Sequence, residues 1–213
     1  MNEQNRSFIF LYPQEEIFDY ELEKGAILYE GRSKIRRALK KAFLPRIERA
    51  ETEAEKEAIQ QEARNQLKRL FRPFYSKKLN ACIDERYRKK GYAINYALLD
   101  DCAVSDIIAL TPRDRVIYVG MDAKTHRTKG SDGEYPYPKS DYIIDQLLPV
   151  GKLVIGGFHL GDCVEKLAMR AYSRGLEVLI DEDLTELFTS KVFDKAFRTN
   201  AFSAHYPSLK ISW

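Results

Sequence analysis

The chain has 213 residues, of which 44% are hydrophobic and 31% charged, enough to bury one sizeable core. The formal net charge of +3 is too small to indicate nucleic-acid binding by itself, and no apolar stretch approaches the length of a membrane-spanning helix. The three cysteines lack the spacings of a disulfide framework or a CxxC zinc site, and the polar start of the chain does not resemble a signal peptide. We therefore expect a cytoplasmic protein that does not contact membranes.

The first apolar run, Phe8–Tyr12, predicts a strand that Pro13 closes. From Ser33 to Phe43, apolar residues recur at helical spacing, and Pro45 is expected to interrupt or kink this helix. The opposite face of the helix carries Lys34, Arg36, Arg37, Lys40 and Lys41. Such a face is more often solvated than bound to phosphate, so nucleic acid ranks last among the expected partners.

Residues 46–72 are dominated by Glu in their first half and by a helical stripe of apolar residues in their second half. This pattern predicts a long helix that first projects into solvent, then docks on the body and ends at Pro73. A further helix is expected from Ser76 to Tyr87. A projecting polar helix gains stability from a partner, so a homo-oligomer contact and an unpartnered surface helix are both open interpretations.

The middle of the chain alternates between strand and helix patterns. Strands are expected at Tyr92–Leu99 and Arg115–Met121, and helices at Val104–Leu110 and Ser140–Leu148. Asp100 directly follows the first of these strands, and the carboxyl ends of parallel strands are where ligands bind.

The segment from Leu153 to Thr185 predicts a strand, a tight turn, a helix and a second strand. The apolar run Leu153–Ile155 is followed by glycines, which suits a strand buried on both faces of a parallel sheet. Apolar residues then recur at helical spacing until Gly175, a typical helix end. Cys163 is expected in the first turn of this helix, where backbone N–H groups favour an anion such as a thiolate.

This segment resembles the signature of the isochorismatase-like cysteine hydrolases, the superfamily that includes nicotinamidases. The signature is a strand ending in glycine, five residues, Cys-Val, alanines at fixed steps, a glycine, an apolar strand and an acidic residue. The matching residues are Gly157, Cys163, Val164, Ala168, Ala171, Gly175, Val178, Asp183 and Thr185. The resemblance covers about Thr111 to Thr185 and does not extend to residues 33–90. The alternative interpretation of Cys163 is an ordinary buried cysteine in a Rossmann-like unit.

The resemblance implies a three-layer α/β/α fold with a mostly parallel, Rossmann-like sheet, in which the thiol of Cys163 attacks a carbonyl group. Backbone N–H groups of Gly161, Asp162 and Cys163 would hold the oxyanion, and His159 in the same turn would orient the substrate. The family also has a lysine that stabilises the thiolate. The two candidates for it are Lys124 and Lys129.

In the family, the catalytic aspartate follows the first strand, and a glutamine often stands two positions after it. This sequence matches the pattern at Gln14 but has Tyr12 in the place of the aspartate. A phenol, with an ordinary pKa of about 10, does not take a proton from a thiol at neutral pH. Asp100 is therefore a candidate for the missing acid, with Tyr12 left to contact substrate. Glu15 and Glu16 are further candidates that could equally be solvated turn residues.

We therefore expect a single domain, residues 1–213, with a helical insertion or arm at about 33–90, that hydrolyses a C–N or related bond of a small molecule. The alternative is a catalytically degenerate member of the same fold that acts as a ligand-binding or assembly protein. No cofactor or metal is expected, because the polar segment Asp122–Lys139 lacks the close Asp/His spacing of metal-binding relatives. The chain should end in a helix, Leu184–Phe197, and an edge strand, Leu209–Trp213.

Overall fold

The structure is a computed structural model. It describes the following residues: 5–19, 32–99, 102–119, 121–122, 127–128, 140–147, 149–158, 163–185 and 210–212.

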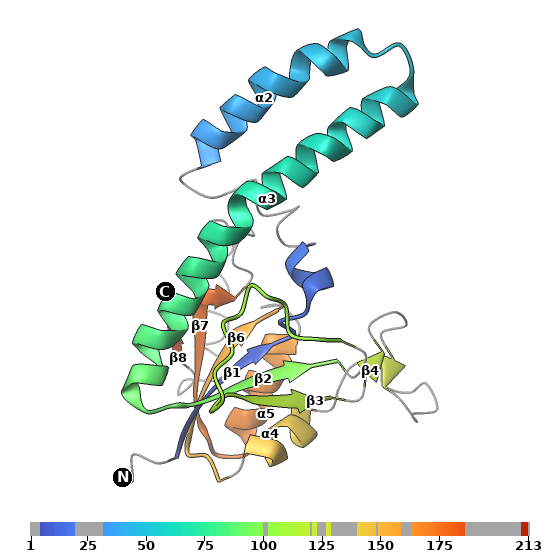
Figure 1. Cartoon of the computed structure of the whole chain (residues 1–213). Coiled ribbons are helices and arrows are strands. Elements are labelled where there is room, and N and C mark those ends of the chain that lie inside the picture. The colour runs from blue at the N-terminus through green and yellow to red at the C-terminus, as the bar shows by residue number, and fades with distance from the viewer. Residues whose placement is uncertain are drawn as a thin grey trace.

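A six-stranded sheet forms the centre of the fold (Figure 1). Its strands are β1 (Arg6–Leu11), β2 (Ala93–Leu98), β3 (Arg115–Tyr118), β6 (Lys152–Gly157), β7 (Glu177–Thr185) and β8 (Lys210–Ser212). Their spatial order is β3-β2-β1-β6-β7-β8, and every neighbouring pair is parallel. The short strands β4 (Met121–Asp122) and β5 (Arg127–Thr128) form a separate antiparallel pair. The predicted edge strand is confirmed by β8.

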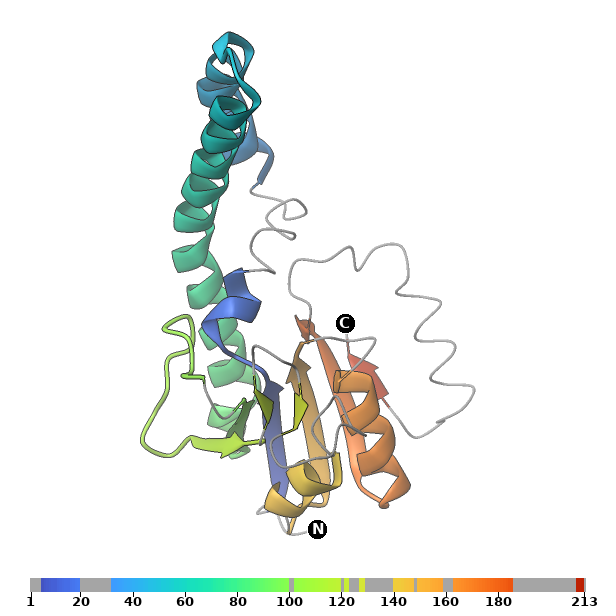
Figure 2. The same ribbon diagram turned by 90° about the vertical axis from the view of Figure 1, so that its right-hand side faces the viewer.

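Helices cover both faces of this sheet, as Figure 2 shows. The helix α3 (Glu53–Arg86) lies on one face, and α4 (Ser140–Leu147) and α5 (Glu165–Ser173) lie on the other. Successive side chains of β1 point to opposite faces of the sheet, as in any strand, so β1 contributes to the core on each face. Phe8 and Phe10 belong to the α3-side core, and Ile9 and Leu11 to the α5-side core. The predicted three-layer α/β/α fold with a mostly parallel sheet is confirmed.

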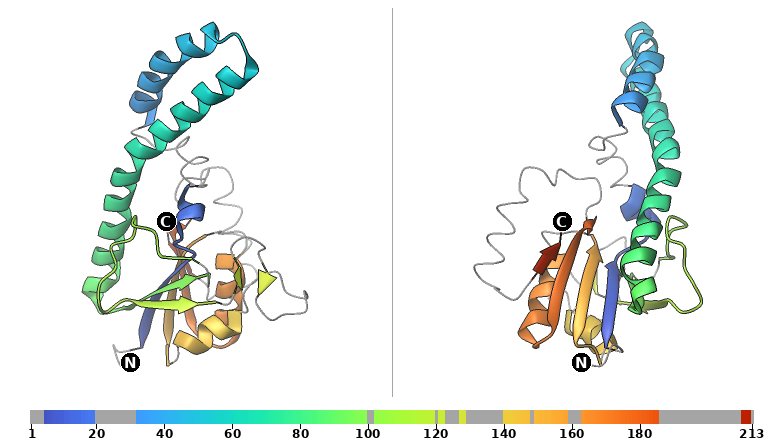
Figure 3. Two further views of the ribbon diagram at one scale, coloured as in Figure 1. Left: turned by 45° about the vertical axis from the view of Figure 1, so that its right-hand side comes forward. Right: turned by 90° about the vertical axis from the view of Figure 1, so that its left-hand side faces the viewer.

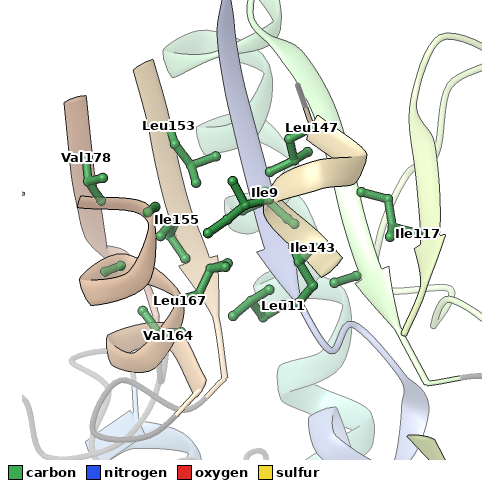
Figure 4. Packing of buried hydrophobic residues seen from close by; sticks show 14 of the residues in the cluster. Ile9, Leu11, Ile117, Ile143, Leu147, Leu153, Ile155, Val164, Leu167 and Val178 are labelled. Carbon is green, nitrogen blue, oxygen red and sulfur yellow. The ribbon is translucent and has the colours of Figure 1, made fainter. Parts of the chain in front are cut away.

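The two cores consist of large apolar side chains. The α3-side core includes Phe8, Phe10, Phe18, Tyr75, Leu79, Ile83, Tyr87, Tyr96 and Phe158. The α5-side core includes Ile9, Leu11, Tyr12, Ile143, Ile155, Val164, Leu167 and Val178. In Figure 4, side chains of β1 and β6 in the α5-side core point towards those of α4 and α5. The aliphatic stripe of α5 is therefore what fixes the helix on the sheet.

The helix α2 (Arg32–Arg49) runs antiparallel to the first half of α3, and the two form a hairpin that extends beyond the carboxyl ends of the strands (Figures 1 and 3). Thr52 and Glu55 make a reciprocal capping box at the start of α3, because each side chain accepts a hydrogen bond from the other residue's backbone N–H. Arg46 of α2 forms an ion pair with Glu62 of α3, with Nη2 and Oε2 2.7 Å apart. These contacts hold the turn between the two helices.

The predicted helix end at Pro73 is wrong, because α3 continues through it. The helix α2 likewise continues through Pro45, where an interruption or a kink was expected. A proline inside a helix costs about 3 kcal/mol. In α3 that cost is offset further along the helix, where Tyr75, Leu79 and Ile83 are at most 3% exposed. Each such buried side chain contributes about 1.5–3 kcal/mol. Packing on the sheet therefore overrides the local preference of the proline.

The predicted helix over Val104–Leu110 is also wrong. Val104 pairs with Gln14 in an isolated antiparallel bridge, and turns follow it. Asn80 of α3 donates a hydrogen bond to the Ile107 carbonyl oxygen at 2.7 Å and accepts one from the Ala109 N–H at 2.8 Å. Because α3 supplies partners for these backbone groups, the segment does not need a helix to satisfy them.

The end of β7 differs from the sequence prediction in a similar way. Leu184 and Thr185 belong to this strand and are buried, whereas the pattern placed Leu184 at the start of a helix. Leu184 packs into the α3-side core, which explains why the strand continues. The rest of the predicted helix lies outside the described residues. Among the helices that the structure describes, none is long and apolar enough to cross a membrane.

Candidate functional site

The strand order of the sheet reverses between β1 and β6, which lie side by side with Ile9 opposite Ile155. Open parallel sheets bind ligands in the crevice at the carboxyl ends of the strands that flank such a reversal. At this edge the two strands are held closely, since the Phe158 N–H donates a hydrogen bond to the Leu11 carbonyl oxygen at 3.1 Å. The candidate site is therefore built from the residues that follow β1 and β6.

Tyr12 follows β1 directly and is the residue that the sequence places where the family has its aspartate. Its φ is +60°, and it is the only residue other than glycine with a positive φ in the described part of the chain. The alternation of β1 would send this side chain to the α3 side, but the left-handed backbone places it in the α5-side core. Positive φ in a bulky residue is strained, and such strain gathers at functional sites.

Two contacts fix Tyr12 in this conformation. Its N–H donates a hydrogen bond to the Ala97 carbonyl oxygen of β2 at 2.8 Å, and the residue is only 6% exposed. The backbone after β1 is thus anchored to the neighbouring strand at the point where the strand order reverses. Because both the backbone bond and the burial depend on the left-handed conformation, the sheet itself imposes the strain.

Cys163 is half-buried and packs against the α5-side core that contains Tyr12. Cys163 and Val164 form a π-helical turn that runs directly into α5, in agreement with the predicted position of Cys163 in the first turn of this helix. Cys102, just after β2, packs against the same core and is also half-buried. Tyr12 and Cys163, both sequence-predicted site residues, are therefore associated with the same core, and so is Cys102, which sequence reasoning did not place at the site.

Glu15, the next acid after Tyr12, is held by Arg72 of α3. The Arg72 Nη2 group donates to one carboxylate oxygen of Glu15 at 2.7 Å, Nη1 donates to the other, and the Ser105 hydroxyl donates to the first at 2.6 Å. The hydrogen bonds from Arg72 hold the pKa of the Glu15 carboxyl below its ordinary value. A carboxylate held in this way is a poor proton acceptor. Glu15 is therefore half-exposed but held in an ion pair, which argues against its acting as a proton acceptor.

Arg72 also donates hydrogen bonds to the loop that follows β2. Its Nε group donates to an Asp106 carboxylate oxygen at 3.1 Å, and its Nη2 group donates to the Ser105 hydroxyl at 3.3 Å. One guanidinium of the helical hairpin thus joins the segment after β1 to the loop after β2. No local sequence pattern predicts this role of Arg72, because Glu15 and Arg72 are 57 positions apart.

Replacing Glu15 by glutamine should change how stability depends on pH. Because the folded pKa is depressed, the stabilisation by the carboxylate is complete above its ordinary value of 4.5 and is lost as the pH falls through the folded value. We expect the variant to melt below the wild type at pH 7, and the difference to shrink as the pH falls below about 4. Thermal unfolding followed by circular dichroism from pH 3 to 7 measures this. Glu57→Gln, at an exposed residue of α3, is the control and should leave the profile unchanged.

Gln14 is a second residue that sequence reasoning left out of the site. It is 1% exposed, and within the described residues no hydrogen-bond donor reaches its Oε1 atom. Buried acceptors of this kind are rare and call for an explanation such as a water or a ligand. The sequence signal was present, because Gln14 matches the glutamine of the family pattern.

Six other predicted site residues lie outside the described residues: Asp100, Lys124, Lys129, His159, Gly161 and Asp162. Their flanks are described. Leu99, buried at 3%, directly precedes Asp100, and the β4–β5 pair brackets Lys124. Among the described side chains, no group of three or more His, Cys, Asp or Glu residues is placed to hold a metal ion.

No family model and no curated protein matches this chain. Solved structures do resemble its fold. One is an isochorismatase family protein, 14% identical over 99% of each chain, with a TM-score of 0.48. Another is a pyrazinamidase of Pyrococcus horikoshii in complex with zinc, 12% identical over 98% of each chain, with a TM-score of 0.48. A third is an isochorismatase from Pseudomonas putida, 12% identical over 100% of this chain and 89% of the other, with a TM-score of 0.46. These likenesses concern the fold alone.

Proposed function

We propose that the protein is a hydrolase that cleaves a C–N or related bond of a small molecule through the thiol of Cys163. The position of Cys163 is the observation that supports this best. It stands between the end of β6 and the start of α5, at the strand-order reversal, half-buried against the core that holds Tyr12. A thiol at that edge reaches a ligand in the crevice, where the strained backbone of Tyr12 also lies.

In the proposed reaction, the Cys163 thiolate attacks the substrate carbonyl carbon, and the carbonyl electron pair moves to oxygen. Backbone N–H groups of Gly161, Asp162 and Cys163 stabilise that oxyanion, and Lys124 or Lys129 stabilises the thiolate. When the intermediate collapses, the C–N bond breaks, and the amine leaves with a proton from an acid such as Asp100. Water then attacks the resulting thioester, which releases the carboxylic acid and restores the thiol. Tyr12 and His159 contact the substrate in this proposal.

The reactivity of the three cysteines tests the proposal. Cys82, Cys102 and Cys163 are all half-buried in the folded protein, so accessibility alone does not separate them. We expect iodoacetamide at pH 7 to alkylate Cys163 at least about ten times faster than the other two, because the thiolate is the reacting form. Peptide mass spectrometry of the full chain measures the three rates.

Two further results belong to the same experiment. Cys163→Ser should abolish hydrolysis of small primary amides while Cys102→Ser retains it. If Cys163 reacts only after the protein is unfolded, the hydrolase proposal is wrong.

The second candidate function is a ligand-binding or assembly protein that keeps the fold without the chemistry. One specific observation favours it: Tyr12 stands in the place of the aspartate, and Arg72 occupies the nearby carboxylate of Glu15. In that case Cys163 would react no faster than Cys82, while a small carbonyl ligand would still raise the melting temperature of the protein.

A further inference from the structure

The helix α2 has an unusual charge composition. Among its 18 residues are one acid, Glu48, and eight bases: Arg32, Lys34, Arg36, Arg37, Lys40, Lys41, Arg46 and Arg49. The first half of α3, its partner in the hairpin, mixes the two signs and pairs Lys56 with Glu53 at 2.6 Å. Bases four residues apart on one helix repel each other and lower its stability. A helix with only a structural role would be more stable if some of these bases were replaced by acidic residues.

The packing of α2 leaves several of its bases facing solvent. Phe43 is 4% exposed, and the neighbouring Leu39 and Ile47 on the same face are half-buried, so this stripe holds α2 in the hairpin. Lys41 lies two residues from Phe43, which places it on the opposite side of the helix. Lys40, Lys41 and Arg49 are exposed. At about 100° per residue, Lys41 and Arg49 lie away from the packed stripe and Lys40 lies beside it. These three exposed residues are called the basic face of α2 here.

The cations of the basic face differ from several of the arginines on the body of the protein. No carboxylate of the described residues forms an ion pair with Lys40, Lys41 or Arg49, whereas Arg46 on the same helix meets Glu62. On the body, arginines that face acids are common: Arg72, Arg86, Arg88, Arg170 and Arg174 each contact at least one carboxylate. With eight bases and one acid, the net charge of α2 is +7, whereas that of the whole chain is +3. Positive charge is thus concentrated on a helix that stands clear of the sheet (Figure 1).

We infer that the basic face of α2 is a docking surface for the phosphate backbone of a nucleic acid. The charge of a phosphate chain complements a row of cations, and release of its counterions drives binding without any apolar contact. A second copy of the chain suits this face less well, because stable protein interfaces bury about 1,000 Å² or more around an apolar centre. Among the hairpin side chains that the structure describes, the large apolar ones that are exposed are Leu44 and Leu70. The sequence pattern alone favoured a solvated face, but Lys40, Lys41 and Arg49 are exposed without a carboxylate partner among the described residues.

The test measures how salt affects binding of the full chain to two fluorescein-labelled probes, a single-stranded RNA of 20 nucleotides and a DNA duplex of 20 base pairs. Fluorescence anisotropy gives the affinity between 50 and 200 mM NaCl. We expect binding that weakens as salt rises. In the variant Lys40→Gln/Lys41→Gln/Arg49→Gln, the slope of log affinity against log salt should fall by about 2 on the single strand, or by about 2.7 on the duplex, because each phosphate contact contributes about 0.7 or 0.9.

A matched control removes the same charge from the body of the protein. Lys77→Gln/Lys90→Gln/Arg113→Gln replaces three exposed bases outside the hairpin and should bind both probes as the wild type does. Glutamine is nearly as good a helix former as lysine or arginine, and circular dichroism checks that both variants fold.

Four results would overturn the inference. The control could lose as much affinity as the α2 variant, or neither probe could bind at 50 mM NaCl. Phosphatidylserine vesicles could bind where the nucleic acids do not. Sedimentation could show self-association that the α2 variant loses, without any binding to nucleic acid.

Discussion

Replacing Gly157 by alanine is expected to destabilise the protein by about 3–5 kcal/mol, because the new side chain meets the backbone of β1. Gly157 has a φ of +99°, and a Cβ atom there would lie 2.3 Å from the Leu11 carbonyl oxygen and 2.4 Å from the Leu11 nitrogen. Neither atom can move without separating β6 from β1, since both strands lie in the middle of the sheet. Urea unfolding followed by circular dichroism would show the loss as a lower midpoint with an unchanged slope.

Gly175 provides the matched control for this variant. Its φ of +85° imposes the same backbone preference, but no atom lies within 4 Å of the Cβ position. Gly175→Ala should therefore cost only about 1 kcal/mol, the penalty of the left-handed conformation alone. If the two alanine variants proved equally stable, the tight contact between β6 and Leu11 would not constrain the crevice as described.

Removing the carboxylate of Asp181 should cost about 3 kcal/mol, as expected when one partner of a buried ion pair is lost. Asp181 lies in β7, and its side chain is 1% exposed. Arg86 donates to both of its carboxylate oxygens at 3.0 Å, and the Tyr87 hydroxyl donates to one of them. These bonds fasten the end of α3 to the sheet. Asp181→Ala would leave both donors without this acceptor, and urea unfolding again provides the measurement.

Asp141→Ala is the corresponding control at the surface. Asp141 pairs with Arg170 at 2.8 Å and with Arg174 at 3.2 Å, yet about half of its side chain is exposed. Exposed pairs contribute little because water screens them. We expect a small change in the urea midpoint, and a loss as large as that of Asp181→Ala would contradict the importance assigned to burial.

Local patterns were sufficient to predict the unit from β6 to β7. A continuous apolar run gave the strand, helical spacing gave α5, and Gly175 marked its end with the expected positive φ. Each of these signals depends on residues close together in the chain. The fold class followed from them, since a strand, a helix and a strand in this order build a parallel sheet.

The parts that could not be predicted depend on contacts between distant residues. Nothing in the sequence around Tyr12 favours a left-handed backbone, which arises because β1 is bound by β2 on one side and β6 on the other. The course of α3 through Pro73 depends on the core beneath it. The ion pair that holds the Glu15 carboxylate is formed with Arg72, and no local sequence pattern connects these two residues.

The place of β1 at the centre of the sheet also has a consequence for synthesis on the ribosome. Ile9 pairs with Ile155, so about 150 further residues must be synthesised before β6 can pair with β1. At 5–20 residues per second this takes about 8–30 s. The hairpin of α2 and α3 needs only nearby residues and can form much earlier. Until β6 emerges, the apolar stretch from Phe8 to Leu11 has an unpaired edge, so the start of the chain is the segment most in need of protection from aggregation during folding.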